Sequence, residues 1–259
     1  MRGIIIGDLL GSSPHPNLAA AQAAAPLAPS AITPLSVATA TALLRNVSYA
    51  YALRHAVRTD PLLQAEPHLA AGLAQPEQRI SRTDWLPPIW ASLSGWAFGS
   101  LGDVEDEAEA IAAATHSHPE TLRAARATAA CVLLLRSGAS PKDVRHYLEG
   151  VGYRTASLLE RVGQIMGTTA PPTLDAAPLL PLATQIVLSQ PSFAAALDAA
   201  LAAAPAPSPL RASLAGLVGA LAEARGLALP DPALALFVHA ADPATQTCVQ
   251  LFAEQYQPT

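Results

Sequence analysis

The sequence predicts an all-α protein, folded as a single compact multi-helix domain over residues 1–259. Hydrophobic residues make up 51% of the chain and aromatic residues only 5%, so much of the apolar content is alanine, the strongest helix former. Apolar residues recur at helical spacing in most segments. The 24 prolines divide these segments into many helices joined by stiff connections. A chain of 259 residues could also form two small domains, but we expect one.

Charge and hydropathy exclude several classes of partner. The net charge is −5 and no basic run occurs, so we expect no nucleic-acid partner. The longest apolar run, residues 127–135, is much shorter than the roughly 20 residues of a membrane span. No signal peptide is visible, and Cys131 and Cys248 form no disulfide framework. We therefore expect a soluble, cytoplasmic protein without a membrane span.

The stretch from Asp103 to Gly138 is predicted to form two helices that meet at a polar corner around His116 and His118. The first helix begins with acidic residues, which suit the positive end of a helix dipole. The pattern Ser117-x-x-Glu120 predicts a capping box at the start of the second. The apolar face of this second helix is small in its middle, which favours a central position in a bundle.

The N-terminal half begins with glycines at positions 3, 7 and 11. On a helix these would share one face and admit a neighbouring backbone, and no Lys-Ser/Thr follows that would indicate a phosphate-binding loop. Residues 13–34 are predicted to be a loop with at most a short helix. Residues 36–59 have helical periodicity and predict one long helix or two short ones.

Three tryptophans, Trp85, Trp90 and Trp96, follow a segment broken by prolines. At this spacing we interpret them as core anchors rather than as a ligand cage.

In the C-terminal half, Ser140-Pro141 opens a helix that stops at Gly150, with proline and glycine at the expected ends. Further helices are expected at about 154–167, 192–203, 210–225 and 242–256, with proline-rich connections at 168–181 and 204–209. No nucleophile elbow, HExxH motif or Cys/His metal spacing is present.

Four segments resemble the ADP-ribosylglycohydrolase family, whose fold is that of dinitrogenase reductase-activating glycohydrolase. They are RGIIIGDLLG, ITPLSVATATALL, AIAAATHSHPETLRAARATAACVLLLRSG and SFAAALDAALAAAPAPSPLRASLAGLVGALAEARG, which together extend from Arg2 to Gly226. The third matches the family's TH segment and following helix most closely. The resemblance implies a helical bundle that holds two Mg²⁺ or Mn²⁺ ions, bound by the aspartates of TDDT and DTDT motifs and an N-terminal acidic residue. These ions orient the ribose of ADP-ribose and help to activate water.

The residues that match those ligands are not carboxylates in this chain. Thr33-Pro34-Leu35-Ser36 takes the place of TDDT, and residues 204–209 replace GGDTDT, with Ala206 and Ser208 at the aspartate positions. The N-terminal acidic position falls on Ser12 or on Asp8, depending on the register. One carboxylate cannot hold two divalent ions, so we expect no metal cofactor. The resemblance places Ser12, Thr33, Ser36, His116 and Ser208 along the former cleft.

The histidines and the acidic run each allow two interpretations. His116 or His118 could contact a nucleotide-like ligand, but we favour histidines that satisfy polar groups at an interhelical turn. Residues 103–107 could form an acidic patch, but a solvated helix start is favoured.

Three functional hypotheses remain open. The leading one is a catalytically inactive member of the family, a pseudoenzyme that binds an unknown protein partner or small ligand. The alternative is a divergent hydrolase of ADP-ribosyl or related N- or O-glycosidic bonds, for which Asp8, His116 and His118 are the candidate acid and base. The third is a helical interaction protein unrelated to the family.

Overall fold

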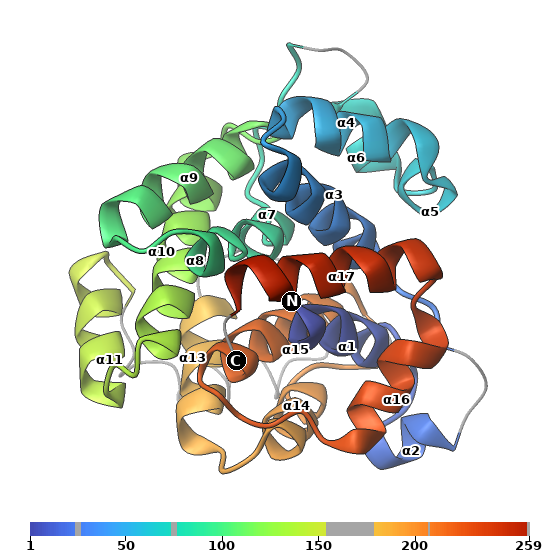
Figure 1. The fold of residues 1–259 in the computed structure, drawn as a ribbon, viewed down its shortest axis with the longest axis vertical. Coiled ribbons are helices and arrows are strands. Elements are labelled where there is room, and N and C mark those ends of the chain that lie inside the picture. The colour runs from blue at the N-terminus through green and yellow to red at the C-terminus, as the bar shows by residue number, and fades with distance from the viewer. Residues whose placement is uncertain (24–26, 74–76, 154–178, 207, 258–259) are drawn as a thin grey trace. The chain divides into compact units, whose positions relative to one another are not determined.

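The computed structural model describes residues 1–23, 27–73, 77–153, 179–206 and 208–257. All regular structure in these residues is helical, which confirms the predicted fold class (Figure 1). Extended backbone pairs there only once, in a parallel bridge between Ile80 and His116. No helix in the described ranges is long and apolar enough to cross a membrane.

The chain forms two compact units. Unit 1 contains Met1, Pro29–Leu133 and Ala241–Thr259, and unit 2 contains Arg2–Ala28 and Leu134–Ala240. Each unit is therefore built from segments that are distant in sequence. The expectation that residues 1–259 form a single domain stays a prediction.

Unit 1 is organised around α3 (Ile32–Arg45), which packs against α4, α7 and α17. Asn46, in the left-handed conformation at φ 50°, ends α3, and Ser48 caps the next helix, so residues 36–59 form two helices rather than one. The remaining helices of the unit are α4 (Tyr49–Thr59), α5 (Pro61–Gln64), α6 (Pro67–Gly72), α7 (Leu86–Ala91), α8 (Ser94–Ala97), α9 (Leu101–Ala113), α10 (Pro119–Arg136, in this unit up to Leu133) and α17 (Pro243–Tyr256).

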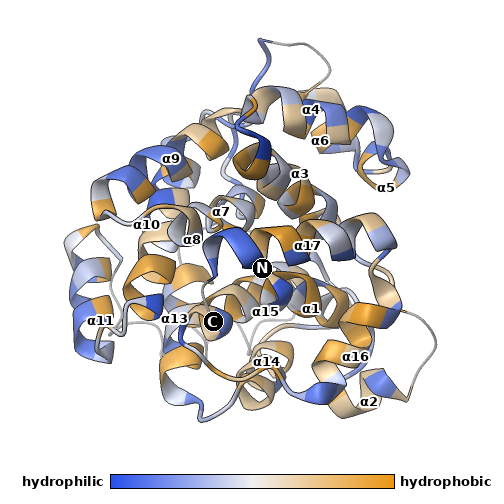
Figure 2. Cartoon of the chain, viewed as in Figure 1, coloured by the Kyte–Doolittle hydropathy of each residue, from blue (hydrophilic) through white to orange (hydrophobic). Residues whose placement is uncertain are grey.

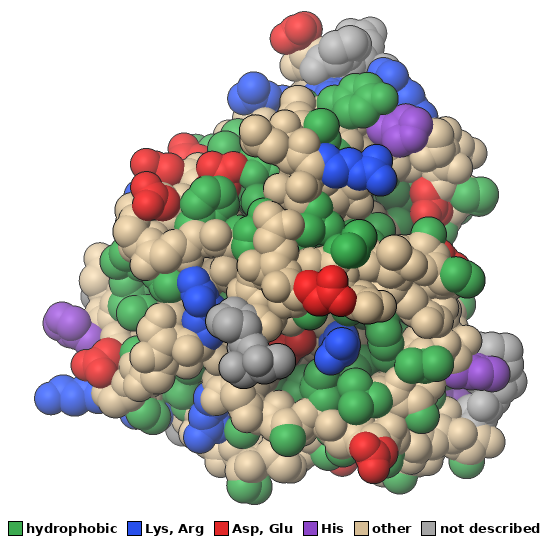
Figure 3. All heavy atoms as spheres, in the orientation of Figure 1, with side chains coloured by type: hydrophobic (Ala, Val, Ile, Leu, Met, Phe, Trp, Pro, Cys, Tyr) green, Lys and Arg blue, Asp and Glu red, His purple; other side chains and the backbone are tan. Residues whose placement is uncertain are grey.

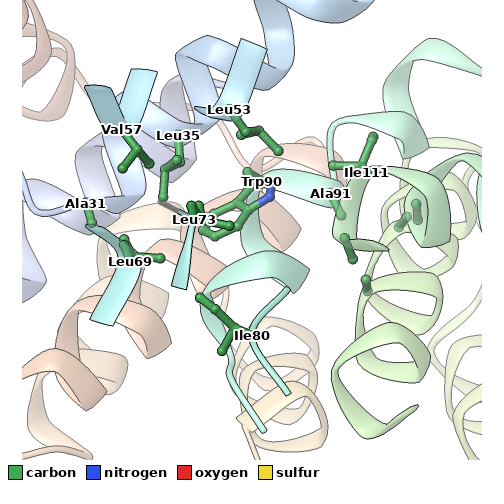
Figure 4. Packing of buried hydrophobic residues seen from close by; sticks show 14 of the residues in the cluster. Ala31, Leu35, Leu53, Val57, Leu69, Leu73, Ile80, Trp90, Ala91 and Ile111 are labelled. Carbon is green, nitrogen blue, oxygen red and sulfur yellow. The ribbon is translucent and has the colours of Figure 1, made fainter. Parts of the chain in front are cut away.

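The core of unit 1 surrounds Trp90, which is completely buried. Figure 4 shows the Trp90 ring among Leu35 of α3, Leu53 of α4 and Leu73. Ile111 of α9 belongs to the same cluster. Trp85 is also buried, which confirms two of the three tryptophans as core anchors, whereas Trp96 is only half-buried.

Unit 2 is built on α15 (Pro209–Ala224), whose residues 211–222 are all buried. Its partners in the unit are α1, α13 and α14, and Figure 2 shows α1 and α14 as mostly hydrophobic. Among its described residues, the helices of this unit are α1 (Arg2–Gly11), α2 (Leu18–Gln22), α11 (Pro141–Gly150), α13 (Leu179–Ser189), α14 (Phe193–Ala202), α15 and α16 (Asp231–Ala240).

The glycines of α1 face α15, as the sequence predicts. A Cβ atom on Gly3 would lie 2.1 Å from the carbonyl oxygen of Gly219, and one on Gly7 would lie 2.1 Å from that of Ala215. Real Cβ atoms do not approach backbone so closely, so this contact requires glycine. The Gly3 amide also donates a hydrogen bond of 2.9 Å to Glu223 Oε2.

Several element predictions need correction. The first helix after residue 30 begins at Ile32 rather than Ser36, so α3 includes Thr33-Pro34-Leu35 in its first turn. The sequence did not predict α13 or α16. The helix expected at 154–167, and most of the connection at 168–181, lie outside the described residues.

Candidate functional site

Asp8 and Ser12, the candidates for the N-terminal acidic position, lie one turn apart on and just after α1 in unit 2. Ser12 Oγ donates a hydrogen bond of 3.2 Å to Asp8 Oδ1. The Asp8 side chain is completely buried, and the helix around it is the one packed on α15 through glycines. Asp8 is therefore buried in the helix that packs on α15, and Ser12 is hydrogen-bonded to it.

Ser208, the third unit 2 candidate, is the N-cap of α15. Its hydroxyl accepts from the Arg211 amide at 3.2 Å and donates to the Pro205 carbonyl at 2.7 Å. A serine hydroxyl in this arrangement satisfies one of the free amides at a helix start. Both hydrogen bonds of Ser208 are thus local and serve the α15 start.

Thr33 and Ser36 lie in the first turns of α3 in unit 1, and both are buried. Ser36 Oγ has no hydrogen-bond partner among the described residues. Leu35, which stands between them, is 1% exposed and belongs to the hydrophobic core cluster around Trp90. Leu35 therefore contributes to the core of unit 1.

His116 is enclosed by polar and aromatic groups at the corner between α9 and α10. Its Nδ1 lies 2.8 Å from Thr115 Oγ1, and its Nε2 lies 3.4 Å from Asp84 Oδ2. The Trp90 ring is 6.5 Å away between centroids. Since His116 is 0% exposed, a ligand in solvent cannot reach its imidazole without a rearrangement of this corner.

Asp84 is the residue of this cluster that the sequence analysis missed. Its Oδ1 also accepts from the Leu86 amide at 3.0 Å, next to the start of α7. An aspartate two residues before a helix with proline in its first turn is a capping signal, which could have singled it out. Burial acts to raise the pKa of Asp84, but the hydrogen bond and charge of His116, the Leu86 amide and the charge of Arg82 together lower it by more, so the pKa is below its usual value.

His118 caps α10. Its Nδ1 accepts from the Glu120 amide at 3.2 Å, so His118 supplies the acceptor that the sequence analysis assigned to Ser117. Thr83 Oγ1 lies 3.4 Å from His118 Nε2. The side chain is half-buried, and its contacts are those of a residue that fixes the corner.

In unit 2, Asp8 and Ser12 contact each other at the end of α1 and Ser208 caps α15. In unit 1, Thr33 and Ser36 lie on α3, and the two histidines lie at the α9–α10 corner. Across the described ranges, no three His, Cys, Asp or Glu side chains come together in a way that could hold a metal ion. No divalent metal site is therefore found among these residues.

Unit 1 contains a groove of about 730 Å³ that none of the candidate residues lines. We call it the α3–α9 groove, because it lies where α3 and α9 end and α4 begins. Its lining side chains include Asn46, Tyr49, Arg79, Phe98, Glu107 and Tyr256.

Two tyrosines are fixed in the α3–α9 groove by hydrogen bonds. The Tyr49 hydroxyl donates to Glu107 Oε1, and the Tyr256 hydroxyl donates to the Leu43 carbonyl at 3.2 Å. Burial raises the pKa of the Tyr49 hydroxyl, and the hydrogen bond to Glu107 raises it further. Tyr49 is therefore a neutral hydrogen-bond donor at physiological pH.

A second, smaller groove adjoins it and shares Ala50, Arg79 and Ala114. Arg54 lines this groove, but its guanidinium is already bound to the carbonyls of Leu73 at 3.1 Å and Gln78 at 2.6 Å. These bonds connect Leu73 and Gln78 to α4.

Comparison of the sequence with protein-family models and with curated proteins found no match.

Proposed function

We propose that this protein is a catalytically inactive relative of the ADP-ribosylglycohydrolases that works by binding a small ligand or a protein partner. The relationship rests on the four sequence segments that resemble that family and on the all-α fold class.

The environment of Leu35 is the observation that carries the inactive assignment. Leu35 aligns with the second aspartate of the family's TDDT motif, and it packs in the core of unit 1 with Trp90 and Leu53. A carboxylate at this position would lose its hydration without gaining a counter-ion, at a cost of several kcal/mol. The apolar surroundings of position 35 therefore suit a core residue and not a metal ligand.

The candidate acid and base residues also favour binding over catalysis. Asp8 and His116 are both 0% exposed, and each is hydrogen-bonded within its own unit. A general acid or base must come within hydrogen-bond reach of the substrate. Burial therefore argues against the divergent hydrolase, which no observation specifically favours.

The test is an assay for release of ADP-ribose from ADP-ribosylated protein, with and without Mg²⁺ or Mn²⁺. We expect no release above background in either condition. Calorimetric titration with ADP-ribose in the same buffers shows whether the family's ligand is still bound.

Turnover that Asp8→Asn abolishes would overturn the proposal, provided that the variant keeps the thermal midpoint and the circular dichroism of the wild type. Because Asp8 is buried, those two measurements are needed to separate lost catalysis from lost folding.

A further inference from the structure

The α3–α9 groove carries an unpaired negative charge. Glu107 accepts a hydrogen bond from Tyr49, and within the described residues it forms no ion pair. Its neighbours on α9 differ: Glu105 and Glu109 pair with Arg126 at 3.3 and 3.2 Å. Figure 3 shows acidic side chains gathered over α9, but of these three glutamates only Glu107 lines the groove, and it has no cation partner among the described residues.

Helix ends add to the negative potential of the groove. Both α3 and α9 end along it, and the last turn of a helix presents carbonyl oxygens and a partial negative charge. The start of α4 contributes the opposite sign, and its cap Ser48 already accepts from the Tyr51 amide. The groove therefore has the partial negative charges of two helix C-termini and the charge of one carboxylate, against the partial positive charge of one helix N-terminus.

Among the described residues that line the groove, Arg79 is the only one with a positively charged side chain. It is exposed and forms no ion pair with Glu107 or with any other residue of the described ranges. Water screens an exposed charge far more than a half-buried one. Arg79 therefore does not neutralise Glu107, and a cation from solution can.

Aromatic rings form part of the groove wall. Tyr49, Phe98 and Tyr256 line it, and all three are half-buried. The Tyr256 ring is fixed at both ends, because its hydroxyl donates to Leu43 and its ring packs 5.0 Å from that of Phe252. Rings held in place before binding lose little entropy on binding, and aromatic faces attract cations whose hydration is weak.

We propose that the α3–α9 groove binds a small organic ammonium ion, with Glu107 as the counter-ion and the rings of Tyr49, Phe98 and Tyr256 as the wall. The volume of about 730 Å³ is within the usual range of small-molecule sites. A methylated ammonium group suits the groove best, because it is weakly hydrated and covers its charge with apolar methyl groups. This inference gives a ligand class to the proposed binding function and does not depend on the family resemblance.

The experiment compares a cation with a neutral molecule of the same shape. Choline and its isostere 3,3-dimethylbutan-1-ol are titrated separately into the full-length protein by calorimetry at low ionic strength. We expect saturable binding of choline, and binding of the isostere that is at least about tenfold weaker, because it lacks the charge that Glu107 and the rings attract.

Two variants locate the binding. Glu107→Gln and Glu109→Gln remove the same charge from the same helix, but only Glu107 lines the groove. We expect Glu107→Gln to weaken choline binding about tenfold or more and Glu109→Gln to leave it nearly unchanged. Tyr49→Phe, which keeps the ring, should retain most of the affinity.

Three results would overturn the inference: equal affinity for choline and its isostere, equal losses in the two glutamate variants, or no binding of choline, tetramethylammonium or spermidine. If ammonium ions fail to bind but the protein binds ADP-ribose without cleaving ADP-ribosyl groups, the inference fails and the proposed function stands. If ammonium ions bind and ADP-ribosyl groups are also cleaved, the inactive assignment fails and the inference stands.

Discussion

Single glycines decide how closely the two main helices of unit 2 can pack. Gly3, Gly7 and Gly219 have no side chain at the points where the backbones of α1 and α15 meet. A methyl group there would contact a carbonyl of the facing helix, and backbone cannot move aside as a flexible side chain can. The contact is therefore sensitive to a single carbon atom.

We predict that Gly7→Ala lowers the free energy of unfolding by about 3 kcal/mol, because its Cβ would lie 2.1 Å from the Ala215 carbonyl oxygen. The matched control is Gly102→Ala on α9, where no atom lies within 4 Å of the added carbon. That change should be neutral, or stabilise the helix by up to about 1 kcal/mol. Chemical denaturation measures both, and equal midpoints for the two variants would contradict the prediction.

Leu35 is a second position at which we expect a single side chain to change the stability of the protein. We predict that introducing aspartate at positions 34, 35, 206 and 208 together destabilises the metal-free protein, and that position 35 accounts for most of the loss. Leu35 is in the core, whereas Ala206 is exposed and Pro34 is half-buried. Burial of a carboxylate adds its desolvation cost to the loss of packing.

The measurement is the thermal midpoint in EDTA of the fourfold variant, of Leu35→Asp and of Leu35→Ala. Leu35→Ala should cost about 2–5 kcal/mol from lost packing alone, and Leu35→Asp should cost more. An unchanged midpoint of the fourfold variant would argue for a hydrated, cleft-facing position and against the proposed function.

At the scale of elements, the corner between α9 and α10 is stabilised by a segment from before α7. The Ile80 amide donates to the Thr115 carbonyl at 2.8 Å, and the Ser117 amide donates to the Ile80 carbonyl at 3.0 Å. The Asp84–His116 contact extends this connection. The segment before α7 is therefore connected to α9 and α10 by the backbone hydrogen bonds of Ile80 and by the contact between the Asp84 carboxylate and the His116 imidazole.

We predict that Asp84→Asn lowers the free energy of unfolding by about 1–2 kcal/mol at neutral pH, the contribution of a charge-assisted hydrogen bond. The pKa of Asp84 is lower in the folded protein than its usual value of 3.8, so its stabilisation is complete above that pH. The stabilisation is lost as the pH falls through the lower folded pKa. The difference between wild type and variant should therefore shrink in acid.

Denaturation curves at several pH values between 7 and the acid limit of folding test this prediction. Asp106→Asn, at an exposed position on α9, is the control and should change stability little at any pH. A difference that grows as the pH falls would contradict the assigned direction of the pKa shift.

At the scale of the whole molecule, carboxylates are numerous but dispersed. The chain has 20 Asp and Glu residues and a net charge of −5. Within the part of the chain that the structure describes, they do not gather into a possible metal site with histidine or cysteine. Divalent cations such as Mg²⁺ need several oxygen ligands in one place, and net charge alone does not supply them.

We therefore predict that the purified protein retains no stoichiometric Mg²⁺ or Mn²⁺ after dialysis against metal-free buffer. Elemental analysis of the dialysed protein measures this directly, with the buffer as the blank. If one or two equivalents of Mg²⁺ or Mn²⁺ survive dialysis and are removed by EDTA, the protein has a metal site and the prediction is wrong.

The sequence alone determined most helix positions, because the signals for them are local. Ser140, Ser192 and Ser208 each cap a helix that the sequence predicted to begin there. The glycine spacing of α1 predicted its close packing, because a spacing of four residues puts those positions on one face of any helix. The sequence did not predict α13, because Pro181 in its first turn follows a proline-rich run that resembles a connection, although proline fits the first turn of a helix.

Only the tertiary structure decided which polar residues meet. Asp84 and His116 are 32 residues apart, and Tyr49 and Glu107 are 58 apart, so no motif in the chain could pair them. The α3–α9 groove likewise draws its lining from α3, α4, α9 and α17. Helix formation depends on neighbours within a few residues, whereas a binding site depends on which helix faces pack together, and that packing follows from the burial of apolar surface over a whole unit.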